Sequence, residues 1–267
     1  MPARAPETLA VAFPSHRPRA LTGTVELALG QTAWSRAARP ARVSRVLELM
    51  FDAISGQPVS PARVRFLASS AREWLLQQAA LRIWPDQGWF QARCATCGHD
   101  VDMPVTLSGA PRKAANSDFP AISVATSLGR RRFEAPNGAH EEALARTVGG
   151  DPARRLLALC GLADTARADA EAFSAEDLVL IETAFDEACP DIADAVSAAC
   201  PSCQATIEAR IDPLQFAFPP PKTVLREVHA IAAAYHWSEE EILALPSSRR
   251  VAYAELIGAD RTGGSRR

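Results

Sequence analysis

The first third of the chain changes its hydrophobic period once, from that of a strand to that of helices. Alternating apolar residues predict a short strand over residues 24–29, whereas apolar positions spaced three or four apart predict helices over residues 41–54 and 71–84. Ser70 and Glu73 have the spacing of a capping box at the start of the second helix, and the same spacing recurs further along the chain in Ser174 with Asp177 and in Ser238 with Glu241. The first twenty residues are rich in proline and arginine, and we expect them to be extended or poorly ordered.

The middle of the chain contains two cysteine pairs, each followed by strand-like alternation. Residues 89–107 predict a strand, a tight turn and a second strand, and residues 207–211 alternate after the second pair. The other predicted elements are a hairpin over residues 121–126 and 131–135, helices over 141–148, 153–159, 174–188 and 191–199, and C-terminal helices over 223–236, 238–245 and 249–257.

The cysteine pairs are the motif with the clearest chemistry. Cys94 and Cys97 form one CxxC, and Cys200 and Cys203 form the other. Two thiolates on a tight turn can share a metal ion, and two such turns complete the tetrahedral sulfur shell that zinc prefers. Gly98 supplies the left-handed backbone that often follows the second cysteine, whereas the second pair has Gln204 there, a weaker match.

The two pairs are separated by 102 residues, far more than in a simple zinc ribbon. We therefore predict an α+β fold, mostly helical, with a split zinc-ribbon-like β unit that carries a long hairpin-plus-helices insertion. The expected division is an extended segment over 1–20, a strand and helices over 21–88, the split ribbon over 89–107 and 199–213, the insertion over 108–198 and C-terminal helices over 222–260.

Other roles for the cysteines are weighed against structural Zn²⁺. A redox-active CxxC is disfavoured because neither pair begins a helix in a βαβ setting, and unligated cysteines remain an alternative. Catalytic zinc needs an open coordination position, which four thiolates do not leave. Cys160 and Cys189 have the surroundings of small buried hydrophobic residues.

Composition bounds the class of protein. With 267 residues, 48% hydrophobic and 22% charged, the chain can bury a core, and no apolar run is long enough for a transmembrane helix or a secretory signal. The expected location is the cytoplasm, with no membrane contact. No glycine-rich phosphate loop, G-x-S-x-G or HExxH motif is present, so no enzyme and no small-molecule substrate are expected.

Charge is distributed unevenly along the chain. Residues 1–133 carry a formal charge of +8 and residues 134–267 a formal charge of −10, although the whole chain has −2. This polarity could orient a docking partner, or it could reflect two solvated faces that differ by chance. Arginines cluster at 130–132, but the acidic second half and the presence of only two lysines argue against nucleic-acid binding.

Several segments together resemble the small baseplate (hub) proteins of contractile-tail phages and related contractile injection systems. These segments are SAREWLL from Ser70, the knuckle CATCG, APNGAHEE from Ala135, the knuckle CPSC, and REVHAIAAAYHWSEEEILALPSSRRVAYAELI, which carries most of the likeness. The resemblance covers residues 65–260, and none of these motifs is a catalytic signature.

The resemblance implies a non-enzymatic structural or assembly role in a baseplate, with other baseplate or tail proteins as partners and incorporation into a tail-like particle. The closing helices are rich in aromatic and aliphatic residues, which suits docking. The expected partner-binding residues there are Tyr235, Trp237, Arg249, Arg250 and Tyr253. The alternative is a zinc-ribbon nucleic-acid-binding or regulatory protein, for which Arg93 and Arg210 are the nearby basic residues. A thiol-redox protein is a third hypothesis.

Overall fold

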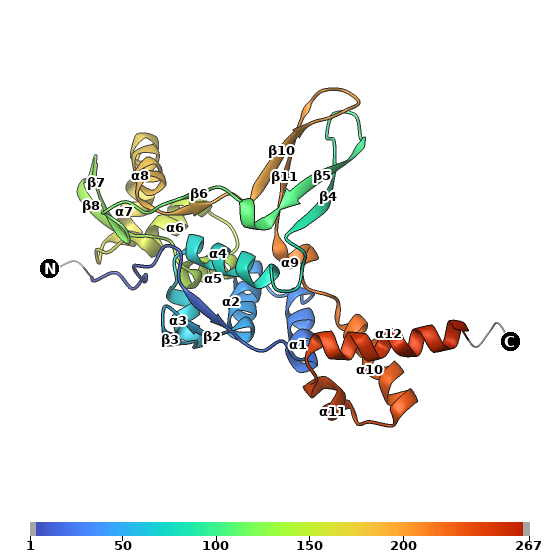
Figure 1. Ribbon diagram of the computed structural model, residues 1–267. Coiled ribbons are helices and arrows are strands. Elements are labelled where there is room, and N and C mark those ends of the chain that lie inside the picture. The colour runs from blue at the N-terminus through green and yellow to red at the C-terminus, as the bar shows by residue number, and fades with distance from the viewer. Residues whose placement is uncertain (1–3, 264–267) are drawn as a thin grey trace.

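Four helices form the body of the protein in the computed structural model, which describes residues 4–263. They are α1 (Gly23–Ala33), α2 (Arg39–Met50), α3 (Pro61–Phe66) and α4 (Ser69–Ala80). Their buried side chains form one hydrophobic core, which includes Leu29, Val46, Leu47, Leu75 and Leu76. Figure 1 shows this body at the centre, with three further lobes attached to it.

The strand expected over residues 24–29 is wrong, because that segment lies inside α1. The side chain of Thr22 caps the helix by accepting a hydrogen bond from the backbone amide of Val25, and Leu29 enters the core of the body. The three alternating apolar residues fit a helical face nearly as well as a strand, so a run this short could not distinguish the two periods.

The helix expected over residues 41–54 ends four residues early. Residues after Met50 continue as β2 (Phe51–Ile54), which pairs with β3 (Gln57–Pro58) and with β1 (His16–Pro18) in a three-stranded antiparallel sheet. The segment from Arg4 to β1 is ordered along the body, with a parallel bridge between Leu9 and Leu67. Over the residues described, the N-terminal segment is therefore held in place against the body.

The insertion forms a lobe with its own core. A hairpin of β7 (Ala121–Thr126) and β8 (Gly129–Glu134) is followed by the helices α5 (Gly138–Arg146), α6 (Pro152–Cys160), α7 (Ala166–Ala172) and α8 (Ala175–Ala188). The predicted hairpin and the capping box of α8, formed by Ser174 and Asp177, are confirmed. Phe133, Phe173 and Ile181 lie in the core of this lobe.

The helix expected over residues 191–199 is wrong. Those residues form two strands, β9 (Asp191–Ile192), which pairs with β6 (Arg112–Lys113), and β10 (Ala195–Ala199), which pairs with β11 (Thr206–Arg210). Alanine-rich sequence favours a helix locally, but pairing with partner strands satisfies the same backbone groups and decides the conformation.

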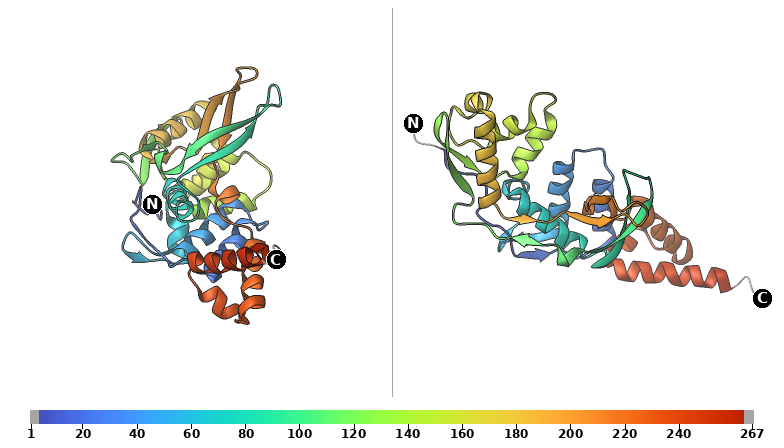
Figure 2. Two further views of the ribbon diagram at one scale, coloured as in Figure 1. Left: turned by 45° about the vertical axis from the view of Figure 1, so that its right-hand side comes forward. Right: turned by 90° about the horizontal axis from the view of Figure 1, so that it is seen from above.

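Two β-hairpins project together from the body as an arm (Figures 1 and 2). The first consists of β4 (Gln87–Arg93) and β5 (Asp100–Thr106), and the second of β10 and β11. The short helices η1 (Leu107–Gly109) and α9 (Pro213–Phe216) lie at the base of the arm. The second hairpin begins at Ala195, four residues before the expected start of the ribbon at 199.

Three C-terminal helices form the last lobe: α10 (Pro221–Tyr235), α11 (Glu239–Ala244) and α12 (Ser247–Gly263). The predicted capping box of Ser238 and Glu241 is confirmed at α11. A small core that includes Val224, Ile231 and Ile242 joins the three helices, and Figure 1 shows α12 extending away from the body. Within residues 4–263, no helix is long and apolar enough to cross a membrane.

Candidate metal centre

The four paired cysteines meet at the tip of the arm. Cys94 and Cys97 lie in the turn between β4 and β5, and Cys200 and Cys203 lie in the turn between β10 and β11. Their ligand atoms all lie within 4.8 Å of one another. The convergence expected across 102 residues of sequence is therefore confirmed.

The spacing of the sulfurs matches a metal shell. Cys94 Sγ and Cys203 Sγ are 3.7 Å apart, and Cys97 Sγ and Cys200 Sγ are 3.6 Å apart. A zinc–sulfur bond of about 2.3 Å in a regular tetrahedron requires sulfurs about 3.8 Å apart, whereas a disulfide requires about 2 Å. All four cysteines are free thiols, so their arrangement fits a four-coordinate cation.

Both knuckles have the same local backbone. The amide of Cys94 donates to the carbonyl of His99, and that of Gly98 donates back to Cys94. The second knuckle repeats this pattern between Cys200 and Ala205 and from Gln204 to Cys200. Gly98 has a φ of 73° and Gln204 a φ of 62°, so the glutamine adopts the left-handed conformation expected of a glycine. The second cysteine turn therefore has the same backbone conformation as the first, although it has glutamine in place of glycine.

The alternation of the strands places a hydrophobic core between the two hairpins. Val101, Met103 and Ile207 are buried there, together with Cys94 and Cys200. The first cysteine of each pair thus belongs to the floor of the centre, while Cys97 and Cys203 are exposed at the tip. Apolar side chains pack against the buried side of the four sulfurs, and the other side, where Cys97 and Cys203 lie, is exposed to solvent and accessible to an ion.

The electrostatics of the cluster favour a bound cation. Backbone amides of Cys97 and Thr96 lower the pKa of the Cys94 thiol to about 6, so this sulfur ionises readily. The amide of Ala205 also favours the thiolate of Cys203, but the sulfurs of Cys97, Cys94 and Cys200 outweigh it and raise the pKa of that thiol to about 12. Four adjacent sulfurs cannot all become negative unless a positive ion balances them.

The arrangement suits a structural rather than a reactive site. Four protein thiolates would fill the tetrahedral coordination of zinc and leave no position for water or substrate. The side chain of His99 is exposed and does not belong to the four-residue cluster. Both cysteine pairs lie in β-turns rather than at a helix N-terminus, where a reactive CxxC has its nucleophilic thiolate stabilised.

The aromatic residues expected to bind a partner form one cluster on the C-terminal lobe. The ring centroids of Tyr235 and Trp237 are 5.4 Å apart, and those of Trp237 and Tyr253 are 5.3 Å apart. The guanidinium of Arg249 lies 5.9 Å from the ring of Tyr253. Tyr235 and Trp237 are 41% and 36% exposed, so this cluster presents aromatic surface to solvent.

Arg250 differs from the other expected partner residues. Its side chain is 1% exposed and forms ion pairs with Glu26 of α1 and Glu227 of α10. Burial lowers the pKa of this guanidinium, but the two carboxylates outweigh burial and raise it overall. Adjacent positions on a helix point about 100° apart, so Arg249 faces outward while Arg250 joins α12 to the rest of the protein. Its charge is not available at the surface.

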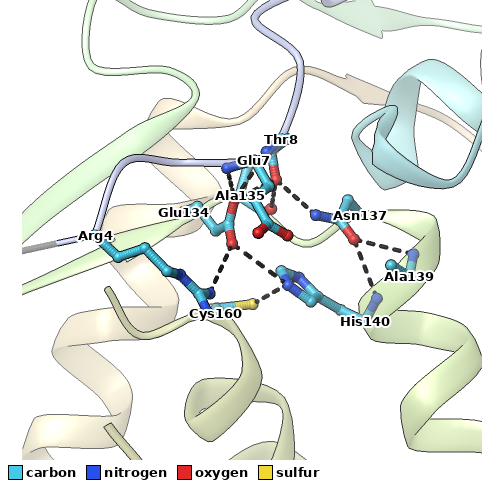
Figure 3. A network of polar contacts seen from close by, with 9 residues as sticks. All are labelled: Arg4, Glu7, Thr8, Glu134, Ala135, Asn137, Ala139, His140 and Cys160. Atoms are coloured by element: carbon cyan, nitrogen blue, oxygen red, sulfur yellow. Dashed lines mark hydrogen bonds and ion pairs between the residues drawn. The ribbon is translucent and has the colours of Figure 1, made fainter. Parts of the chain in front are cut away.

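A buried polar network joins the N-terminal segment to the insertion, and the sequence analysis missed it (Figure 3). The carboxylate of Glu134 accepts hydrogen bonds from the amides of Glu7, at 2.7 Å, and Thr8, at 2.8 Å. On its other side, His140 Nε2 lies 3.5 Å from Glu134, and His140 Nδ1 lies 3.5 Å from the Cys160 sulfur. No linear motif indicates this network, because its members come from three separate segments.

Cys160, His140 and Glu134 form a thiol–imidazole–carboxylate chain like that of a catalytic triad, but the surroundings of the thiol are unsuitable for a nucleophile. Cys160 is fully buried, and burial raises the pKa of its thiol above the usual range, so the sulfur stays protonated. The side chain of Asn137 caps α5 by accepting hydrogen bonds from the amides of Ala139 and His140. The network therefore holds structure together rather than attacking a substrate.

The capping box expected at the start of α4 is absent. The helix begins after Ala68, which has no capping side chain, and Glu73 instead forms a two-pronged ion pair with Arg39.

Comparison with known proteins adds no relative to this description. No protein-family model, no curated protein and no solved structure matches the chain. The observed features of the site are thus an α+β scaffold and four clustered thiols with the geometry of a metal centre.

Proposed function

We propose that this protein is a non-enzymatic structural or assembly component of the baseplate of a contractile phage tail or contractile injection system, and that its arm is a split zinc ribbon. The observation that carries the proposal is the cluster of four cysteine sulfurs within 4.8 Å of one another. Four thiolates would fill the coordination shell of a zinc ion, so the ion would have a structural role and no open position for a substrate or water.

The metal has a clear mechanical role in this proposal. The two hairpins are separated by the whole insertion, and each is a two-stranded ribbon, which is marginally stable alone in water. A shared Zn²⁺ fastens their tips, so the insertion is held as a closed loop on the body. The chain's own residues supply four thiolates, a hydrophobic floor and two backbone turns that orient the sulfurs.

The baseplate assignment rests on the resemblance of residues 65–260 and on the exposed aromatic cluster of the closing helices. Tyr235, Trp237 and Tyr253 offer rigid aromatic area, which is characteristic of interface hot spots. Nucleic-acid binding is less well supported, because Arg93 and Arg210 near the knuckles are ion-paired with Asp100 and Asp194.

Two measurements test the proposal. Elemental analysis of protein purified without added metal should find one zinc per chain, and Cys97→Ser together with Cys203→Ser should abolish it. In the host cell, deletion of the gene should remove intact contractile particles from electron micrographs, and the wild-type gene should restore them. Normal particles in the deletion strain, or a salt-dependent gel shift with DNA or RNA, would overturn the baseplate role and leave the metal centre intact.

A further inference from the structure

Negative charge is concentrated in one part of the insertion lobe. From residue 156 to residue 209 the chain has eleven acidic residues and a single basic one, Arg167. This stretch includes α7 and α8 and ends in the second hairpin of the arm. A segment with such a bias generates a strong negative potential over the surface where its side chains emerge.

Part of this charge is used inside the fold. Asp169 is ion-paired with Arg131, and Asp177 accepts hydrogen bonds from the amide and hydroxyl of Ser127. The acidic residues on the outer side of α8 are different. Glu176, Glu182, Asp186 and Glu187 are exposed, and none of them has a side-chain ion pair within the described structure.

The same outer face has an apolar centre. Val179 is 60% exposed and Leu180 is 50% exposed. Val179 lies on the side of α8 opposite to Ile181, which enters the core, and Leu180 lies about 100° further around the helix, at the border of this outer side. Glu176 and Glu187 flank this pair at helical spacing. Figures 1 and 2 show α8 projecting from the lobe, with the hairpin β7–β8 beside it.

Stability of the helix does not explain this pattern. The inner face of α8 already packs on the lobe core. Asp186 and Glu187 occupy the last turn, where the negative end of the helix dipole disfavours acidic side chains. Lys113 of β6 donates a hydrogen bond to the backbone carbonyl of Asp186, but neither carboxylate has an ion-pair partner within the described structure. Exposed apolar residues bordered by carboxylates that lack ion-pair partners are typical of a recognition surface.

We propose that the outer face of α8 is a docking surface for a basic amphipathic helix of a partner protein. Val179 and Leu180 would contact the apolar stripe of that helix, and the surrounding carboxylates would pair with its lysines and arginines. Nucleic acid and anionic membranes are repelled by the same carboxylates. A second copy that used the same face would bring two acidic surfaces together. This surface depends on neither the metal centre nor the baseplate assignment.

A labelled peptide probe tests this surface on the full-length protein. The probe is a helical peptide of leucine and lysine with one apolar face, and its two controls are the same peptide with glutamate for lysine and a scrambled peptide of identical composition. We expect fluorescence anisotropy to show binding of the amphipathic lysine peptide, and binding of either control at least about tenfold weaker.

Three variants locate the binding. V179S/L180S removes the apolar centre and should weaken binding about tenfold or more. L225S removes one exposed leucine from α10 and should change binding less than about twofold. E176Q/E187Q should weaken binding and reduce its dependence on salt. Circular dichroism confirms that each variant is folded.

Several results would overturn the proposal: no binding of the amphipathic lysine peptide, equal binding of a control peptide, or equal loss in L225S. Binding of duplex DNA or of phosphatidylserine vesicles that V179S/L180S abolishes would assign the face to one of those ligands instead. Self-association in sedimentation experiments that the same variant abolishes would assign it to a second copy.

Discussion

Removing one sulfur from the metal centre should unfold the arm and leave the helical body intact. The substitution Cys200→Ser tests this, because Cys200 is fully buried at the floor of the centre and contributes to the arm core. The body, the insertion and the C-terminal lobe each have a separate hydrophobic core. The loss should therefore remain local to the β4–β5 and β10–β11 hairpins.

The structure indicates how much the metal contributes. Three large apolar side chains, Val101, Met103 and Ile207, are buried in the arm core, and at about 1.5–3 kcal/mol each they contribute about 5–9 kcal/mol. A structural zinc site contributes about 10 kcal/mol or more. Loss of outer-shell contacts alone lowers metal affinity 10–100-fold, so loss of a ligand should lower it at least about a hundredfold, or about 3 kcal/mol.

Hydrogen–deuterium exchange measured by mass spectrometry distinguishes the arm from the body. Amides of β4, β5, β10 and β11 should lose at least about a hundredfold of their protection in Cys200→Ser, and more in wild-type protein treated with a strong chelator, which removes the whole contribution of the metal. Amides of α2 and α4 should exchange as before. The matched control is Cys189→Ser, which removes a thiol outside the metal shell. Cys160 is a poorer control because its sulfur contacts His140.

Two results would refute this reasoning. If the arm keeps its protection without metal, the hydrophobic floor alone stabilises the hairpins. If α2 and α4 lose protection as much as the arm does, the lobes unfold as one cooperative unit and their separate cores do not act independently.

Three further predictions concern the scaffold. Gly138→Ala places a methyl group closer to the buried Arg72 guanidinium than van der Waals contact allows, so urea titration should show a loss of about 1–3 kcal/mol in the free energy of unfolding. Arg250→Met leaves two carboxylates without their partner and should lower the free energy of unfolding by about 3–5 kcal/mol, whereas Arg249→Met should change it by less than about 0.5 kcal/mol. Equal effects of the two substitutions would contradict the assignment of Arg250 to the interior. Burial raises the pKa of Glu134, but its hydrogen-bond partners lower that pKa overall, so the contribution of Glu134 to stability is complete above the unfolded-state pKa of about 4.3 and is lost as the pH falls below it. Tryptic cleavage in the N-terminal segment should therefore accelerate in that acidic range, and Glu134→Gln should remove that pH dependence.

The sequence predicted local features well where the pattern was long or chemically distinctive. The two CxxC turns, the alternating strands beside them, and the capping boxes of α8 and α11 all appear in the structure. These features depend on neighbours within a few residues, so their physical causes are contained in short stretches of chain. The convergence of the four sulfurs was predictable for a different reason, since the chemistry of a tetrahedral site requires four ligands.

The errors share one cause. Residues 24–29 are too short a run to distinguish strand from helix, and residues 191–199 favour a helix locally. Packing against the body decided the conformation of the first segment, and pairing with β6 and β11 decided that of the second. Glu73 has the spacing of a capping residue, but Arg39, 34 positions away, attracts its carboxylate more strongly than the helix end does. Distant partners of this kind leave no periodic trace in the sequence.

The amino-acid sequence by itself determined the α+β class, the turns that carry the two cysteine pairs and the identity of the four clustered cysteines, because each of these depends on residue chemistry at short spacing. Only the tertiary structure decided that Arg250 is internal, that Glu134, His140 and Cys160 form one network, and that the outer face of α8 is acidic around an apolar centre. Burial and long-range electrostatics govern those outcomes, and both depend on which parts of the chain lie side by side after folding.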